Sequence, residues 1–282
     1  MSNIPDPILQ GLQRGWKVLG GKHGALPERL SCDVAIIGSG AGAGITAELL
    51  TKAGLNVVII EEGPLKSSTD FKQLEPEAYA SLYQENAGRK TKDKGITILQ
   101  GRSVGGTTTV NWTSSFRTPP ETLKFWQDRF GLKDYSVEAL APYFQQVQTR
   151  LNIEPWAVAP NENNELLRRG AAKLGIKAEV IPRNVKGCYN LGSCGMGCPT
   201  NAKQSMLVTT LPFALDRGAT LLVETRVEKM VIEGSRVTAL QCIAVKSNAA
   251  PAHPGGVVTT VVARHIVLAG GAINSPALLM RS

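Results

Sequence analysis

The feature that most constrains the fold is a glycine-rich turn that directly follows a short apolar run. Residues 33–37 read Asp-Val-Ala-Ile-Ile, which is typical of a buried strand, and residues 38–43 read Gly-Ser-Gly-Ala-Gly-Ala. A helical segment follows from Ile45 to Ala53, and Gly54 is suited to end it. Residues 57–60, Val-Val-Ile-Ile, predict a second buried strand. Together these segments predict a βαβ unit with a parallel sheet.

The residues of this turn have separate tasks in a dinucleotide site. Gly38 would make the tight turn, Gly40 would let the backbone approach a pyrophosphate, and Ala43 would keep the helix and strand close. The helix presents its unpaired N–H groups to the phosphates. Glu61 ends the second strand, 61 − 38 = 23 positions after Gly38, where an acidic residue binds a ribose hydroxyl. Glu62 is expected to face solvent. The spacing predicts a dinucleotide site without choosing between FAD and NAD(P).

Composition supports a folded enzyme. The 282 residues are 43% hydrophobic and 19% charged, which excludes disorder as the main state and permits one or two domains. With 29 glycines and only 5% aromatic residues, an α/β enzyme with many tight turns is favoured over an aromatic-rich recognition module. The net charge of +8 could serve nucleic acid, an anionic membrane surface or a phosphate-bearing cofactor, and it is explained most simply by a soluble basic protein. No nucleic-acid recognition motif accompanies that charge, so no nucleic-acid partner is expected.

The N-terminus predicts a cytoplasmic protein. It shows no secretory signal, and no run in the sequence approaches the ~18 apolar residues that span a bilayer. The five cysteines are an odd number, which argues against a purely disulfide-stapled secreted chain. Ile8, Leu12 and Trp16 recur at helical spacing. We expect this stripe to dock on its own domain, with peripheral membrane contact as the less favoured alternative.

The patterns along the chain predict a cofactor-binding domain that is interrupted by an insertion. The expected parts are a lead-in with a short helix at 1–30, a first cofactor-binding part at 31–118, a helical and cysteine-rich insertion at 119–215, and a second cofactor-binding part at 216–282. Within the insertion, residues 119–180 are expected to be largely helical. Strands are expected at 220–223, 227–232, 237–245, 257–263 and 265–268. A last helix begins near Gly271 and reads as unfinished at Ser282.

A second glycine- and threonine-rich loop covers residues 101–111. Its adjacent Gly105 and Gly106 allow a close approach of the backbone, and their N–H groups can cradle anionic oxygens. The alternative for this loop is an ordinary hairpin turn.

With these segments in view, the sequence resembles the glucose–methanol–choline (GMC) oxidoreductases over about residues 30–282. Four segments match in order, namely the first glycine-rich turn, the loop at 101–111, the strand region around Val227, and residues 271–279. The second and fourth look like the two long signatures of that family. Ser115 is a departure, because the first signature usually has an aromatic residue or Ala there, and Phe116 comes one position late. This departure concerns a detail of local packing and not the family.

The resemblance implies an FAD-binding, Rossmann-like α/β fold with an inserted, mostly helical segment. It also implies an FAD enzyme that takes hydride from the carbon of a small-molecule alcohol, as an oxidase or an alcohol dehydrogenase. The residues implied for the cofactor are Gly38, Gly40 and Ala43 at the pyrophosphate, Glu61 at the adenosine ribose, Arg102, Gly105, Gly106, Thr107 and Asn111 along the flavin and its phosphates, and the backbone of Val227 at the adenine. The electron acceptor stays open between oxygen, quinone and cytochrome.

Three cysteines cluster as C-x5-C-x3-C at Cys188, Cys194 and Cys198. Some GMC dehydrogenases carry an iron–sulfur cluster on a similar loop, so the resemblance makes these cysteines candidate ligands of a three-iron cluster, or of a four-iron cluster with an outside ligand. A disulfide, buried thiols and zinc are the alternatives, although zinc normally takes four ligands. Cys32 and Cys242 fall in strand-like runs and are expected to pack in the core.

Alcohol oxidation by a flavin needs a base for the hydroxyl proton. GMC enzymes use a histidine from the C-terminal half, and none of His23, His253 and His265 lies in such a motif. The chain therefore resembles an N-terminal cofactor-binding part that lacks the substrate domain and is inactive alone. The alternatives are a non-catalytic flavin-binding or iron–sulfur electron-transfer module, and a pyridine-nucleotide enzyme. The second glycine-rich loop argues against a pyridine-nucleotide enzyme.

Overall fold

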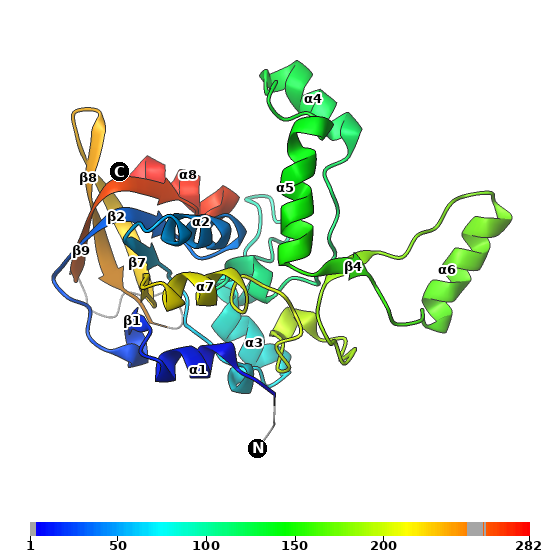
Figure 1. Ribbon diagram of the computed structural model, residues 1–282, viewed down its shortest axis with the longest axis horizontal. Helices are drawn as coiled ribbons and strands as arrows, with labels where there is room; N and C mark the ends of the chain where they lie inside the picture. The colour runs from blue at the N-terminus through cyan, green and yellow to red at the C-terminus, as the bar shows by residue number, and fades with distance from the viewer. Residues whose placement is uncertain (1–3, 247–255, 257) are drawn as a thin grey trace. The chain divides into compact units, whose positions relative to one another are not determined.

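A computed structural model describes residues 4–246, 256 and 258–282 (Figure 1). The chain forms two compact units. The first unit comprises Met1–Asn111, Ser193–Asn201 and Ser205–Ser282, and the second comprises Trp112–Gly192 and Ala202–Gln204. The first unit is therefore assembled from three separate pieces of the sequence.

The first unit is built on a seven-stranded sheet in the order β1-β6-β3-β2-β9-β8-β7. Its strands are β1 (Lys17–Leu19), β2 (Arg29–Ile37), β3 (Val57–Ile60), β6 (Thr220–Leu222), β7 (Thr225–Glu233), β8 (Arg236–Ala244) and β9 (Thr259–Leu268). Strands β1, β6, β3, β2 and β9 pair in parallel, whereas β8 pairs antiparallel with both β9 and β7. The mixed sheet confirms the predicted Rossmann-like α/β class.

The predicted βαβ unit is confirmed. Strands β2 and β3 run parallel with Val34 opposite Val57, and helix α2 (Ala41–Lys52) connects them. All four residues of β3 are buried, as expected for a parallel strand that is covered on both faces. Gly54 follows α2 with a φ of +83°, a left-handed conformation that glycine adopts readily at a helix end.

Four further helices belong to the first unit, namely α1 (Pro7–Gln13), α3 (Glu75–Leu82), α7 (Thr210–Asp216) and α8 (Gly271–Arg281). Helix α2 packs against β2, β3 and α7, and α8 packs against β7 (Figure 1). The core beneath them is aliphatic and includes Val58, Leu222 and Leu240. Short 3-10 turns are η1 (Gly21–His23), η2 (Ser68–Asp70), η3 (Gln84–Ala87), η4 (Gly106–Thr109) and η5 (Cys194–Met196).

Two elements differ from the sequence prediction. The lead-in contributes β1 to the sheet edge beside β6, and three residues are too few to show the alternation that marks a strand. The strands predicted at 257–263 and 265–268 form one strand, β9. Exposed Arg264 and His265 break the apolar pattern, but parallel pairing with β2 continues, with His265 opposite Val34. Val257 and residues 247–255 lie outside the described residues.

The second unit contains α4 (Pro120–Phe130), α5 (Val137–Arg150) and α6 (Glu162–Lys173), which confirms the helical character predicted for 119–180. Strands β4 (Ile153–Pro155) and β5 (Pro182–Asn184) precede and follow α6 in the sequence, and they pair antiparallel with each other. Across the described ranges of both units, no helix combines the length and the apolar character needed to cross a membrane.

Candidate cofactor site

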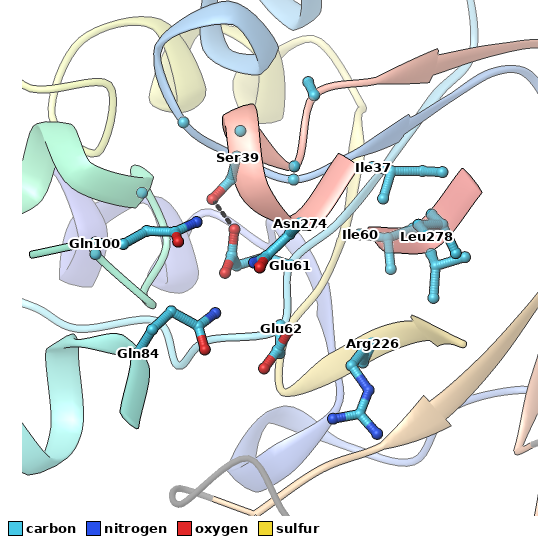
Figure 2. A pocket seen from close by; sticks show the side chains of 18 of the residues that line it. Ile37, Ser39, Ile60, Glu61, Glu62, Gln84, Gln100, Arg226, Asn274 and Leu278 are labelled. Atoms are coloured by element: carbon cyan, nitrogen blue, oxygen red, sulfur yellow. Dashed lines mark hydrogen bonds between the residues drawn. The ribbon is translucent and has the colours of Figure 1, made fainter. Parts of the chain in front are cut away.

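A cavity of about 720 Å³ lies at the carboxyl ends of the parallel strands of the first unit (Figure 2). Strand β2 leads into Gly38, β3 leads into Glu61, and β9 leads into Ala269, and all three residues line the cavity. Open α/β sheets bind their ligands at this edge. The volume falls in the ~300–1,000 Å³ range of cofactor and small-molecule sites.

Glycines form part of the cavity wall and approach other main-chain atoms closely. Gly38 has a φ of +102°, and a Cβ there would lie 2.5 Å from the carbonyl oxygen of Ala269. Gly106 has a φ of +55°, and a Cβ there would lie 2.8 Å from the Cα of Gly40. Larger residues at either position would push the segments apart. The two glycine-rich segments found in the sequence therefore meet across this cavity.

Two helices begin at the cavity without a side-chain cap. The N-cap of α2 is Gly40 and that of α8 is Gly270, and both residues line the cavity. Neither first turn carries an acidic residue. The first N–H groups of each helix have no intrahelical acceptor, and they coincide with the positive end of the helix dipole. This arrangement is suited to bind anionic oxygens.

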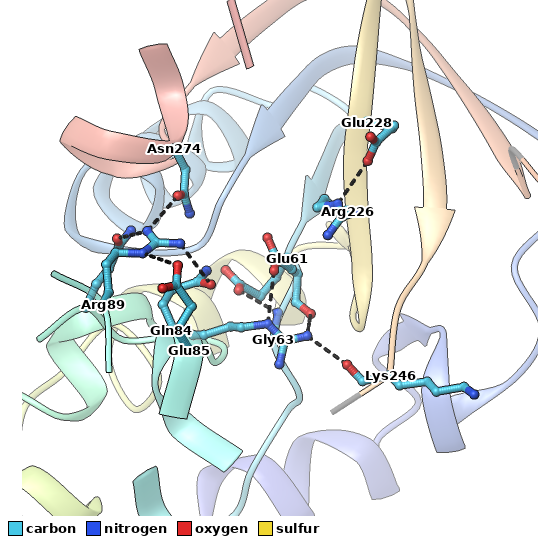
Figure 3. A network of polar contacts seen from close by, with 12 residues as sticks. Glu61, Gly63, Gln84, Glu85, Arg89, Arg226, Glu228, Lys246 and Asn274 are labelled. Atoms are coloured by element: carbon cyan, nitrogen blue, oxygen red, sulfur yellow. Dashed lines mark hydrogen bonds and ion pairs between the residues drawn. The ribbon is translucent and has the colours of Figure 1, made fainter. Parts of the chain in front are cut away.

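Glu61 is buried at the end of β3, where it accepts two hydrogen bonds. Ser39 Oγ donates to Glu61 Oε2 at 2.5 Å (Figure 2), and the Gly63 N–H donates to Oε1 at 2.8 Å (Figure 3). Burial dominates over these two bonds and raises the pKa of Glu61 to about 7. Ser39 lies between the glycines of the turn and was not singled out in the sequence, because a small residue there carries no signal of its own.

Glu62 does not face solvent as predicted, because it pairs with Arg102. Arg102 Nε donates to Glu62 Oε1 at 3.0 Å, and the side chains are only 2% and 19% exposed, respectively. Arg102 Nη2 also donates to the carbonyl oxygens of Glu62 and Lys246, at 3.2 and 2.9 Å (Figure 3). The hydrogen bonds of this guanidinium thus hold the chain segment that follows β3 in place.

The residues predicted from the sequence divide into two groups. Those that line the cavity are Gly38, Gly40, Glu61, Gly106, Thr107 and Val227. Ala43 is fully buried in α2. Gly105 takes the left-handed conformation before η4, and its N–H donates to Ser39 Oγ. The Asn111 N–H donates to the Thr107 carbonyl oxygen. Ala43, Arg102, Gly105 and Asn111 are not among the residues that line the cavity.

Arg89 is the centre of a polar network that the sequence did not reveal (Figure 3). Its guanidinium contacts four side chains of the cavity lining, namely Gln84, Glu85, Gln100 and Asn274. These residues come from two stretches of chain about 185 positions apart, since Asn274 belongs to α8. No local motif marks Arg89, although Asn274 lies inside the second signature-like segment. On another wall, Arg226 Nε pairs with Glu228 at 3.0 Å.

The cysteines and histidines lie elsewhere. Cys188 belongs to the second unit, whereas Cys194 and Cys198 belong to the first. All five cysteines are thiols, so the disulfide alternative is not realised in the structure. No group of three or more His, Cys, Asp or Glu side chains within the described residues is placed to hold a metal ion. Neither His23 nor His265 lines the cavity, and His253 is outside the described residues.

Comparison with known protein families supports the interpretation of the cavity as a cofactor site. The family model described as GMC oxidoreductase matches residues 79–282. The chain is 30% identical to the long-chain-alcohol oxidase FAO1 of Arabidopsis thaliana over 261 residues, which are 90% of this chain and 34% of that protein. It is 34% identical to an uncharacterized GMC-type oxidoreductase, y4nJ, of Sinorhizobium fredii over 257 residues, which are 90% of this chain and 50% of that protein.

Solved structures show the same fold. Pyridoxine 4-oxidase from Mesorbium loti superposes with a TM-score of 0.66 at 22% identity, covering 89% of this chain and 52% of that one. A formate oxidase superposes with a TM-score of 0.62 at 14% identity, covering 90% and 48%. The chain therefore spans about a third to a half of the length of the proteins it matches.

Proposed function

The chain belongs to the GMC oxidoreductase family, and from this premise we propose that it is the cofactor-binding part of an FAD-dependent oxidoreductase that acts on the CH–OH group of an alcohol. The single observation that carries the proposal is the cavity at the carboxyl ends of β2, β3 and β9. It combines a backbone cradle, two uncapped helix N-termini and a buried carboxylate. These are the recognition elements of a dinucleotide.

The residues of the cavity fit FAD in the following way. The N–H groups at the start of α2 would bind the pyrophosphate, and the glycines at 38, 40 and 106 leave room for it beside the backbone. Ionised Glu61 would accept hydrogen bonds from the ribose hydroxyls of the adenosine. The backbone of Val227, which also lines the cavity, would contact the adenine. When bound, FAD supplies the acceptor for the hydride of the alcohol carbon.

The proposed substrate is a long-chain alcohol, with oxygen as the favoured acceptor. Four Arabidopsis relatives at 29–31% identity carry the name long-chain-alcohol oxidase. No base is assigned among the residues that the structure describes, because His23 and His265 do not line the cavity and His253 lies outside the described residues. The 282-residue chain is therefore expected to bind FAD without turning over alcohol, and measurable alcohol oxidation by it would contradict this point.

The test is to purify the 282-residue chain, remove any bound cofactor, and titrate it with FAD. We expect flavin absorbance to co-purify with the protein and FAD to rebind stoichiometrically, while NADH does not bind. A protein that binds NADH and not FAD would overturn the proposal in favour of a pyridine-nucleotide enzyme. Gly106→Val is the matching negative control, since its side chain would enter the space against Gly40.

An iron–sulfur cluster on Cys188, Cys194 and Cys198 stays a prediction, and with it the alternative of an electron-transfer module. Iron and acid-labile sulfide analysis of anaerobically purified protein tests it. The cluster hypothesis requires both elements to be present and to be lost together in the Cys198→Ser variant. A cytoplasmic location likewise stays a proposal, which cell fractionation tests.

A further inference from the structure

The Arg89 guanidinium donates hydrogen bonds to three side-chain carboxamides, and FAD binding alone does not explain this arrangement. Arg89 Nη1 donates to Gln100 Oε1 at 2.7 Å and to Asn274 Oδ1 at 3.0 Å, and Nη2 donates to Gln84 Oε1 at 3.5 Å. The Arg89 side chain is 17% exposed. All three contacts run to carboxamide oxygens, since a guanidinium can only donate.

These contacts fix the orientation of each carboxamide. With its oxygen held by Arg89, each amide presents its NH2 group on the side away from the guanidinium. The three side chains all line the cavity (Figure 2). Gln100 Nε2 also lies near the start of α8, because a Cβ built on Gly271 would be 3.5 Å from it. Amide donors and an uncapped helix N-terminus therefore share one side of the cavity.

The backbone around Arg89 is held in an unusual conformation. Glu85, Asn86 and Ala87 have φ values of +52°, +55° and +63°, which non-glycine residues rarely adopt in succession. Arg89 Nε bonds to Glu85 Oε1 at 2.8 Å, and the Gly88 N–H bonds to the Glu85 carbonyl oxygen at 2.8 Å. Strained backbone of this kind persists where the surroundings over-determine it, which is frequent at binding sites.

We infer that Arg89 is a positioning residue of the cofactor site, which turns the NH2 groups of Gln84, Gln100 and Asn274 into the cavity as donors to an acceptor-rich part of the bound cofactor. This inference rests on the proposed function, because it takes FAD as the occupant. Arg89 itself acts through the carboxamides. A lysine could keep the charge but not the forked geometry that holds several oxygens at once.

The test compares the FAD dissociation constants of the 282-residue chain and its variants, measured by quenching of flavin fluorescence. We expect Arg89→Lys to weaken FAD binding about tenfold or more, since donors are lost or misaligned. Gln100→Met, which removes the donor without adding charge, is expected to act in the same direction. The double variant should bind within about threefold of Arg89→Lys alone, because the loss of Arg89 already misaligns the Gln100 donor. Arg168→Lys, on exposed α6, is the matched control.

Gln100→Glu separates positioning from a merely structural role. The glutamate keeps an oxygen towards Arg89 and adds a charge that attracts the guanidinium. If Gln100 has only a structural role, the unfolding temperature should be unchanged or higher and the FAD affinity should be unchanged. Positioning predicts the same stability with weakened FAD affinity and an altered visible absorption band of the bound flavin.

FAD binding to Gln100→Met and Gln100→Glu with wild-type affinity would overturn the inference and leave the proposed function standing. A wild-type chain that binds no FAD would overturn both. If Arg89→Lys does not fold, the FAD affinities of Gln100→Met and Gln100→Glu test the inference.

Discussion

Ser39 joins the two glycine-rich segments of the cofactor site to Glu61. Its Oγ accepts a hydrogen bond from the Gly105 N–H at 3.0 Å and donates one to Glu61 Oε2 at 2.5 Å. Ser39 is fully buried, and Glu61 is 7% exposed. The small residue between Gly38 and Gly40 thus fixes the carboxylate at the end of β3.

Replacing Ser39 by alanine is expected to lower the free energy of unfolding by about 1–3 kcal/mol, because it leaves the buried Gly105 N–H and Glu61 carboxylate each without this partner. Urea denaturation of the 282-residue chain measures the change. Ser81→Ala is the matched control, since the Ser81 hydroxyl makes an exposed bond to the Glu77 carbonyl oxygen on α3. Equal stability of the two variants would show that Ser39 is not a structural link.

The stability of the cofactor-free chain should fall as the pH rises from about 4.5 to 7. Burial raises the pKa of Glu61 from 4.5 to about 7, so the folded state holds a proton that the unfolded state has released in this range. The stabilisation by this bound proton is complete below the pKa of Glu61 in the unfolded chain and is lost as the pH rises through the pKa of Glu61 in the folded chain. It amounts to about 3 kcal/mol. Unfolding of Glu61→Gln measured over the same range should show a flatter profile. Parallel profiles for the two proteins would contradict the raised pKa.

Gly106→Ala is expected to destabilise the chain by about 1–3 kcal/mol and to weaken FAD binding. The residue has a φ of +55°, and a Cβ would lie 2.8 Å from the Cα of Gly40, so both backbone strain and the close contact oppose the change. Gly170→Ala, in α6, has nothing within 4 Å of the added Cβ and should be stabilising by about 0.5–1 kcal/mol. Thermal unfolding and FAD titration of both variants check the contrast. An unaffected Gly106→Ala would mean that the segments can separate at no cost.

Arg102→Met is expected to cost about 3–5 kcal/mol, because it leaves partly buried Glu62 without its cation. Arg14→Met is the exposed counterpart. Arg14 pairs with Asp216 at 2.8 Å, but the two side chains are 52% and 41% exposed, so the expected loss is below about 1 kcal/mol. Denaturation of the two variants in parallel measures the difference. Similar losses would show that burial does not set the strength of the Arg102 pair.

Several features were predictable from the sequence because each depends on residues that are close together along the chain. They are the βαβ unit, the positions of Gly38, Gly40 and Glu61, and the family. Apolar runs mark buried strands, and the glycine spacing marks the turn between strand and helix. The loop that contains Gly106 was also found in this way, because its composition is unusual over several adjacent residues.

The remaining features depend on partners that are distant in the sequence. Arg102 sits in a family signature, but its pairing with Glu62 and with the Lys246 carbonyl oxygen is a product of the folded chain. Arg89 and Asn274 are likewise joined only after the segment at 84–101 reaches α8. Strand β1 was missed for the same reason, since its three residues become a strand by pairing with β6.

The pairing of β2 with β9 has a consequence for how the protein is made. Val34 lies opposite His265, so the centre of the sheet joins residues 231 positions apart (265 − 34 = 231). At about 5–20 residues per second, a ribosome needs roughly 12–46 s to deliver β9 after β2. Throughout that time, one edge of β2 is exposed on the nascent chain as an open template for wrong pairings. Elongation rate and nascent-chain chaperones are therefore expected to set the yield of folded protein in a heterologous host.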